Sequence, residues 1–224
     1  MNGPMNHWLW THRVIDLLDP VIPLASTDIT QPLINRVRVR RSGDWMIATA
    51  SDRYVAGAAR VPADDDCPPD GWAVEISLAD AKQWLTLAKG YRRAKFSAML
   101  VRVDGQRLIV GNDPLSGGFD SELTLTLLQD RMPPVEGLIK TVTKQRSAAP
   151  VEGWGLNADF LRKFSNAQRI FGGHAGTGRV LRLAHGEHLG ISIQVGDDFV
   201  GVIMGVRLMT PRRPEWWSDV EADA

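Results

Sequence analysis

The chain has little of three things that would narrow its function at once: cysteine, net charge and uninterrupted apolar sequence. Its one cysteine, Cys67, can form neither an intramolecular disulfide nor a cysteine-rich metal site, so we expect a reducing compartment. The 26 basic and 26 acidic residues cancel, which excludes attraction to nucleic acid or membrane by bulk charge and leaves only local patches. The apolar N-terminal stretch contains Asp16 and Asp19 and no small-residue cleavage site, so we expect neither a signal peptide nor a membrane span.

Hydrophobic residues make up 44% of the 224 positions, enough for two modest cores. Two stretches repeat one order of elements, a helix followed by antiparallel strands. The periodicity predicts helices over 11–22 and over 77–91, the second capped by Ser77. The expected strands are 36–41, 45–52, 54–61, 72–78, 94–103, 106–112 and 120–128. Because the chain lacks a regular alternation of single strands and helices, it predicts an α+β fold with antiparallel sheets.

A third helix-and-strands unit is expected after a segment rich in proline. Residues 131–150 contain three prolines and no sustained period, as is typical of a domain linker. Asn157 can cap a helix that ends at Gly172 and Gly173, and three strands follow between 179 and 209. The expected division is a first domain of two units (1–130), a linker (131–150), a shortened second domain (151–210) and a flexible acidic tail (211–224).

Basic residues gather on the expected helices. Lys82, Lys89 and Arg93 share a stripe that lies about 120° from the apolar stripe of their helix, given roughly 100° per residue. Arg162 and Arg169 stand opposite the phenylalanines of the later helix in the same way. Such faces suit contact with backbone phosphates, which does not depend on base sequence and permits sliding. The alternative is an ordinary solvated face, since runs of charge usually are solvated.

Enzyme-like motifs are present but incomplete. His185 and His188 flank an acid, as in a metal site, yet they fall at an expected hairpin tip with no third ligand nearby. The glycine-rich stretch 171–178 follows a helix and lacks the lysine of a phosphate-binding loop. Residues 114–121 lack the glycine spacing of a nucleophile elbow. We expect no catalytic residue, metal or cofactor; a metal-dependent hydrolase using His185 and His188 is the remaining enzyme hypothesis.

Four segments, taken together in their order along residues 28–209, carry a resemblance to a known family. They are DITQPLINRVRVR (28–40), ATASDRYVAGA (48–58), DRMPPVEGLI (130–139) and VIMGVRLM (202–209). They resemble segments of the bacterial DNA polymerase III β sliding clamp family, in a shortened form of the kind found in bacteriophages. The first resembles the turn that leads to a long strand. The others resemble Ala-Thr-Asp-x-His-Arg-Leu-Ala, Gly-Arg-Phe-Pro-Asp-Tyr and the C-terminal Val-Met-Pro-Met-Arg-Leu of that family.

This resemblance implies a DNA clamp fold in which helices line a pore and sheets face outward. It implies a non-enzymatic processivity factor, in the cytoplasm of a bacterium or phage-infected bacterium, that encircles double-stranded DNA as a homo-oligomeric ring. A polymerase and a clamp loader would bind through short linear peptides, and no membrane partner is expected. The cations expected to face DNA are Lys82, Lys89, Arg92, Arg93, Arg162, Lys163 and Arg169. The wall of the implied peptide-binding pocket comprises Thr49, Arg53, Tyr54, Leu138, Ile139, Met204, Val206, Arg207 and Leu208.

The sequence departs from the family pattern in two ways. Ala50 and Asp52 stand where the family has aspartate and histidine, and Gly205 where it has proline, so a different peptide preference is expected. Three helical units are found where a two-domain clamp has four. Either 135–145 forms a degenerate fourth helix, or the second domain is half-sized. Four units would give a trimeric ring, which we favour; three would require another stoichiometry. The alternative function is a clamp-fold module or decoy that binds replication proteins without encircling DNA.

Overall fold

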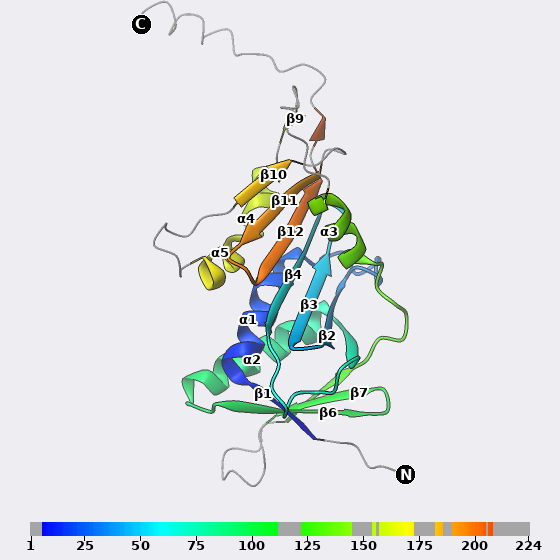
Figure 1. Ribbon diagram of the computed structural model, residues 1–224. Helices are drawn as coiled ribbons and strands as arrows, with labels where there is room; N and C mark the ends of the chain where they lie inside the picture. The colour runs from blue at the N-terminus through cyan, green and yellow to red at the C-terminus, as the bar shows by residue number, and fades with distance from the viewer. Residues whose placement is uncertain are drawn as a thin grey trace, which may run out of the picture.

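The computed structural model describes residues 6–111, 122–144, 154–155, 157–172, 182–185, 190–204 and 206–207. Two antiparallel sheets organise the chain (Figure 1). The larger has the strand order β10 (Arg182–His185), β11 (Gly190–Val195), β12 (Phe199–Met204), β4 (Val55–Pro62), β3 (Trp45–Ser51), β2 (Arg36–Ser42) and β5 (Ala73–Ser77). The smaller has the order β1 (His7–Trp10), β6 (Ala98–Asp104), β7 (Arg107–Gly111) and β8 (Glu122–Thr126). A short pair joins β9 (Trp154–Gly155) to β13 (Val206–Arg207).

The helices are α1 (Thr11–Val21), α2 (Leu78–Arg93), α3 (Val135–Lys144), α4 (Ala158–Arg162) and α5 (Ser165–Phe171), and a 3-10 helix (Ile22–Leu24) extends α1. Both expected caps are confirmed. The Ser77 hydroxyl accepts a hydrogen bond from the Asp80 amide at 3.0 Å, and the Asn157 side chain accepts one from the Asp159 amide at 2.9 Å. These bonds satisfy amides that the first turn of a helix leaves without partners. No helix among the described residues is long and apolar enough to cross a membrane.

The first unit (7–62) and the second unit (73–126) exchange their first strands. β1 precedes α1 in sequence but pairs with β6 of the second unit, while β5 precedes α2 but pairs with β2 of the first unit. The two helices pack against each other and against strands of both sheets, with Leu17, Leu18 and Trp84 fully buried. Each unit therefore covers the sheet edge that the other would leave open.

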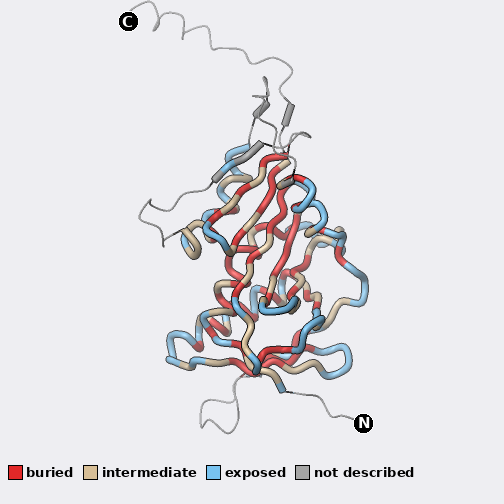
Figure 2. The backbone as a smooth tube through the Cα atoms, viewed as in Figure 1, coloured by how far each residue is buried: buried red, intermediate tan, exposed pale blue. Residues whose placement is uncertain are grey.

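The third unit (154–207) extends the sheet of the first. β12 pairs with β4, with Phe199 opposite Ala59 and Gly201 opposite Gly57. The larger sheet consequently runs without a break from the first unit to the third, and buried segments follow the middle of its strands (Figure 2). The α+β clamp fold expected from the sequence is confirmed. How the chain divides into domains stays a prediction, because this continuous sheet joins the segments on both sides of 131–150.

Helix α3 lies within the segment that was expected to be a linker, and it covers the opposite face of the larger sheet from α1 and α5. Val135, Ile139 and Val142 pack against Ala56 and Val202 in a small separate core. The neighbouring residues along the same strands, such as Val55 and Ile203, belong to the main core on the other face. The alternative of a helix over 135–145 was therefore the better description, and among the described residues α3 has no strands of its own.

Candidate functional site

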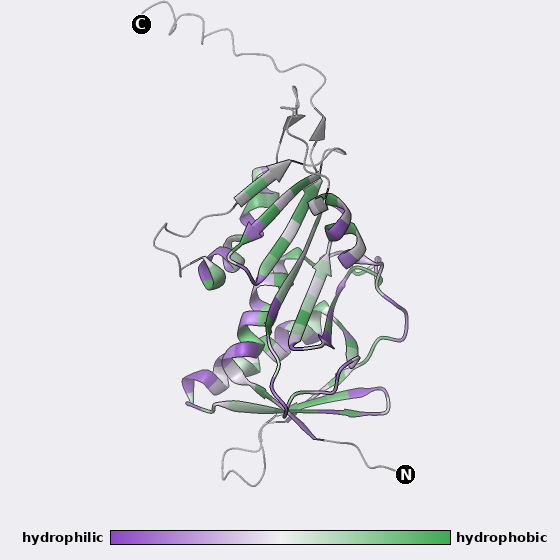
Figure 3. Ribbon diagram, viewed as in Figure 1, coloured by the Kyte–Doolittle hydropathy of each residue, from purple (hydrophilic) through white to green (hydrophobic). Residues whose placement is uncertain are grey.

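The helices α1, α2 and α5 form one face of the molecule, with α1 between the other two (Figure 1). Hydrophilic residues are visible on the outer sides of these helices (Figure 3). Cations from both flanking helices converge on Asp19 of α1, whose side chain is only 6% exposed. The Lys89 Nζ donates to the Asp19 carboxylate at 3.1 Å, and the Arg169 guanidinium donates to the other carboxylate oxygen. Two of the cations expected to face DNA are thus held by a buried acid.

Asn166 completes this junction. Its amide nitrogen donates to the Asp19 backbone oxygen at 3.2 Å and to a carboxylate oxygen at 3.3 Å. Asp19 therefore receives donors from α2 of the second unit and from α5 of the third. A carboxylate that is buried requires such compensation, because it loses its hydration. The junction ties the helices of three units together.

Two more of the expected cations also form ion pairs. Lys163 pairs with Asp52 at the tip of the β3–β4 hairpin. Arg162 pairs with Asp159 at 3.4 Å, and both side chains are highly exposed, so this pair contributes little to stability. Lys82, Arg92 and Arg93 are exposed and form no ion pair with another described residue. They are the cations most available to a polyanion.

Asp16 brings a second acid to this helix face. Burial raises its pKa above the ordinary value for aspartate, although His12, Arg92 and Arg169 act in the opposite direction. The raised pKa means that desolvation of the carboxylate outweighs its attraction to these cations. Sequence reasoning used Asp16 and Asp19 only to exclude a membrane span. Their spacing of one helical turn within an apolar helix was the signal that could have identified them as partners for buried cations.

The expected peptide-binding residues lie partly together, around the β3–β4 hairpin. The Tyr54 ring is 54% exposed and stacks on Phe160 of α4 with centroids 5.4 Å apart. The Met204 amide donates to the Tyr54 carbonyl at 2.8 Å, which brings the end of β12 to the same place. Arg53 has a φ of +84°, a backbone conformation that is uncommon for residues other than glycine. An exposed tyrosine ring stacked on a partly buried phenylalanine, with a methionine in the neighbouring strand, suits the binding of an apolar peptide.

The other expected pocket residues are distributed differently. Thr49 is buried within β3, and Ile139 is largely buried where α3 packs on the sheet. Leu138, next to it on α3, is 40% exposed. Val206 and Arg207 form β13, although only their backbone is described, and Leu208 lies outside the described residues. Phe160 was not anticipated as a pocket residue. The pocket therefore stays a prediction, and the structure adds an aromatic partner to it.

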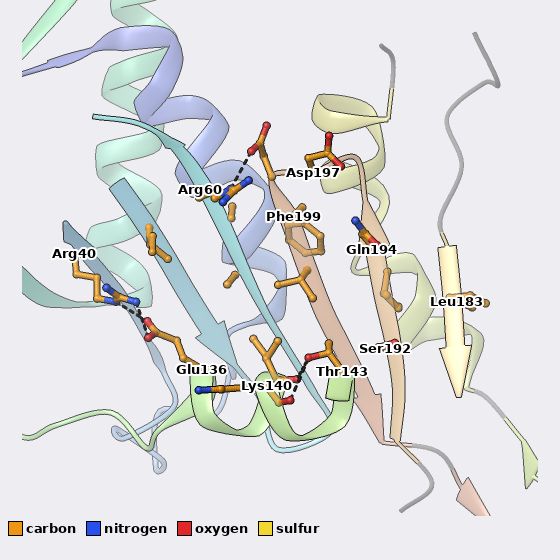
Figure 4. Close-up of a pocket in the computed structure, with 17 residues that line it drawn as sticks. Arg40, Arg60, Glu136, Lys140, Thr143, Leu183, Ser192, Gln194, Asp197 and Phe199 are labelled. Atoms are coloured by element: carbon orange, nitrogen blue, oxygen red, sulfur yellow. Dashed lines mark hydrogen bonds and ion pairs between the residues drawn. The ribbon is translucent and has the colours of Figure 1, made fainter. Parts of the chain in front are cut away.

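A groove of about 790 Å³ lies on the face of the sheet that carries α3. Figure 4 shows α3 crossing the strands at one end of it and Arg60, paired with Asp198 at 3.0 Å, at the other. Arg40 forms two 2.8 Å hydrogen bonds with Glu136 at its side. The lining includes the apolar side chains of Ile47, Ala58, Ile139, Leu183 and Val200. Sequence reasoning missed this groove because it joins strands of two units with the supposed linker.

The enzyme-like motifs fall largely beyond what the structure describes. His185 ends β10, whereas 186–188 lie outside the described residues, as do 114–121 and 173–178. Within the described ranges, no group of three or more His, Cys, Asp or Glu side chains is arranged to hold a metal ion. Cys67 is buried, and burial raises the pKa of its thiol. A higher pKa lowers the fraction of reactive thiolate.

Three solved structures show what the fold resembles. The DNA polymerase III β subunit of Thermotoga maritima matches 93% of this chain and 67% of its own, at 12% identity and a TM-score of 0.66. The pol III β of Caulobacter crescentus matches 92% and 68%, at 14% identity and a TM-score of 0.66. The DNA polymerase sliding clamp of Bacillus subtilis matches 92% and 65%, at 12% identity and a TM-score of 0.61.

The chain thus spans about two thirds of the length of these proteins. No family model and no curated protein sequence matches it. At such low identity the likeness is one of fold. The resemblance first found in short sequence segments therefore extends to the three-dimensional arrangement of nearly the whole chain.

Proposed function

We propose that this protein is a DNA sliding clamp, a non-catalytic processivity factor that encircles duplex DNA and tethers a replicative polymerase. The observation that carries the proposal is the likeness to bacterial β clamps over 92–93% of the chain. The bacterial cytoplasm, with or without phage infection, is the place where such a protein acts. Its partners are double-stranded DNA, other copies of the chain, and peptides of a polymerase and a clamp loader.

DNA binding would be topological and would use the helix face of α1, α2 and α5. Lys82, Arg92 and Arg93 supply mobile positive charge to phosphates, while Lys89, Lys163 and Arg169 have acidic partners. Few phosphate contacts give weak attraction that falls with salt and does not depend on base sequence. A clamp needs this combination, since dissociation is then limited by ring opening and movement along the duplex stays fast.

Peptide binding is assigned to the surface formed by Tyr54, Phe160 and Met204. The stacked rings offer an apolar platform, and the backbone of Met204 at the end of β12 is hydrogen-bonded to that of Tyr54. Methionine adapts to partners of different shape because its side chain is unbranched and polarizable. The ion pair of Lys163 with Asp52 holds the hairpin tip against the third unit, so the platform is built before a peptide arrives.

The experiment loads the protein on nicked circular DNA with a clamp loader and then linearises the circle. We expect the loaded protein to stay bound to the circle and to slide off the free ends of the linear product. The combined variant Lys82→Ala, Arg92→Ala, Arg93→Ala should load several-fold less well. The matched control is Arg107→Ala, Arg131→Ala, Lys140→Ala, which removes the same charges from exposed residues outside α1, α2 and α5. The proposal would be contradicted if the protein stayed bound to linear DNA. It would also be contradicted if the two triple variants reduced loading equally.

A second candidate is a clamp-fold module that binds replication peptides without encircling DNA. Four of the seven cations expected to face DNA have acidic partners, and this observation favours the module. Comparing retention on circular and on linear DNA distinguishes the two candidates. The module binds peptides through Tyr54 but shows the same weak retention on circular and on linear DNA.

A further inference from the structure

The groove on the α3 face of the larger sheet has no part in the function proposed above. Its floor is formed by neighbouring strands, with the partly exposed side chains of Ile47 in β3, Ala58 in β4 and Val200 in β12. Its volume of about 790 Å³ is that of clefts that bind small organic ligands. Covering this apolar floor would remove it from water, which favours the binding of an apolar group.

Helix α3 separates the groove from the peptide surface around Tyr54. The order of residues along β4 shows this: Tyr54 comes just before the strand, Ala56 packs against α3, and Ala58 lines the groove. Leu138 of α3, which was expected in the peptide-binding pocket, is not among the residues that line the groove. The groove is therefore a second surface, on the other side of α3 from Tyr54.

Charged side chains surround the apolar floor. The pairs of Arg40 with Glu136 and of Arg60 with Asp198 hold four of them. Two others, Lys140 and Asp197, form no ion pair with another described residue. Figure 4 shows Lys140 on α3 at one end of the groove and Asp197 at the opposite end. The groove thus suits a ligand with apolar groups for the floor and an acid at the α3 end.

The segment that follows β13 has this composition. Residues 208–224 lie outside the described residues, and in their sequence Glu215 directly precedes Trp216 and Trp217. The nine residues 208–216 span up to about 30 Å when extended. Strand β12, which forms part of the floor, is six residues long, or about 20 Å. The segment after β13 is therefore long enough to return along the groove from its α3 end.

We infer that Trp216 and Trp217 dock on the floor of this groove in the same chain, with Glu215 beside Lys140. Two indole rings bury a large apolar area and lose little rotamer entropy. Attachment to β13 gives the tail a high effective concentration at the groove, so docking within one chain prevails over docking between chains. Any other ligand of the groove must then displace the tail. The inference does not depend on DNA binding, so the loading experiment and the docking experiments can fail separately.

A pair of cysteines in the full-length chain tests the docked position. Lys140→Cys combined with Glu215→Cys should form a disulfide within one chain at least about ten times faster than the control, Lys82→Cys combined with Glu215→Cys. Lys82 is exposed on α2 and does not line the groove, and the buried Cys67 is present in both variants. Electrophoresis without reductant separates disulfides within a chain from those between chains. Equal rates, or a disulfide formed mainly between chains, would overturn the inference.

A labelled synthetic peptide of residues 208–224 provides a second measurement, by fluorescence anisotropy. It should bind the variant Trp216→Ala, Trp217→Ala at least about tenfold more tightly than the wild-type protein, whose groove its own tail already occupies. Adding Ala58→Glu to that variant places a charge on the groove floor and should abolish peptide binding. Ala73→Glu, at an exposed position of β5, is the matched control and should leave binding unchanged. Binding to the variant that is no tighter than to the wild type, or that survives Ala58→Glu, would overturn the inference.

Discussion

Asp19 lies one helical turn beyond Asp16 on α1 and accepts hydrogen bonds from three side chains of two other helices. Its partners Lys89 and Arg169 are 37% and 49% exposed, so each cation keeps part of its hydration while the carboxylate loses nearly all of its own. The carboxylate therefore depends on the cations more than they depend on it. Asp19 therefore neutralises one cation of α2 and one of α5, while Lys82, Arg92 and Arg93 of α2 have no ion-pair partner among the described residues.

Asp19→Asn should lower the free energy of unfolding by about 1–3 kcal/mol, because charge-assisted hydrogen bonds at a buried position are lost. Urea denaturation measures this change. The same variant frees two cations, so the dependence of DNA affinity on salt should become steeper by about one to two units of slope. Asp159→Asn is the matched control, because its pair with Arg162 is exposed, and it should change stability by less than about 0.5 kcal/mol. Equal stability losses in both variants would contradict the role of Asp19.

At the scale of elements, the junction between β4 and β12 depends on two facing glycines. A Cβ at Gly201 would lie 2.4 Å from a ring carbon of Phe164 and 3.0 Å from the Ala56 carbonyl. A Cβ at Gly57, directly opposite, would lie 2.4 Å from Leu24. These contacts are too close for a methyl group. The pair of glycines lets Leu24 of the 3-10 helix and Phe164, at the start of α5, pack closely on the same sheet surface.

Gly201→Ala should destabilise the protein by about 1–3 kcal/mol through overpacking against Phe164. Gly90→Ala is the control, because Gly90 is in α2 and a Cβ there meets nothing within 4 Å. We expect that substitution to be neutral or to stabilise by up to about 1 kcal/mol through helix propensity. Thermal unfolding of both variants distinguishes crowding from a general sensitivity of glycine positions. A neutral Gly201→Ala would mean that the sheet surface relaxes.

At the scale of the molecule, one core is shared by all three units. Leu18, Trp84, Phe164 and Phe199 belong to a single buried cluster, and the larger sheet runs through the first and third units. Neither half of that sheet can be removed without exposing the other. The domain division expected from the sequence stays a prediction, and this core joins described segments on both sides of 131–150.

The whole chain should consequently unfold in one cooperative transition. Far-UV circular dichroism and tryptophan fluorescence should give the same urea midpoint. The fluorescence is the sum over eight tryptophans, of which Trp84 belongs to the buried cluster. Gly201→Ala should keep a single unfolding transition at a lower urea midpoint. The substitution weakens packing where β12 pairs with β4, but all three units still contribute to one core. Two resolved transitions would show instead that the third unit folds as a separate domain.

Local features followed from the sequence because they depend on neighbours along the chain. Ser77 and Asn157 were recognisable as caps, since a cap bonds to an amide two or three residues later. The stripe of Ala81, Trp84, Leu85 and Ala88 was recognisable from its helical period, and all four are buried. The apolar period of α3, formed by Val135, Ile139 and Val142, covers only a short helix. It was difficult to recognise because it directly follows two prolines, which are typical of a linker.

The sequence by itself determined most of the helices and strands, the caps at Ser77 and Asn157 and which side of a helix is basic, because these properties arise between residues close together along the chain. It did not predict the strands β1 and β9 or the division of the helix expected after Asn157 into α4 and α5. Only the tertiary structure decided that the first two units exchange strands and that Arg169 meets an acid 150 positions away. The physical reason is that pairing between charges or strand edges depends on distance in space. The fold sets that distance by packing all three units on one core.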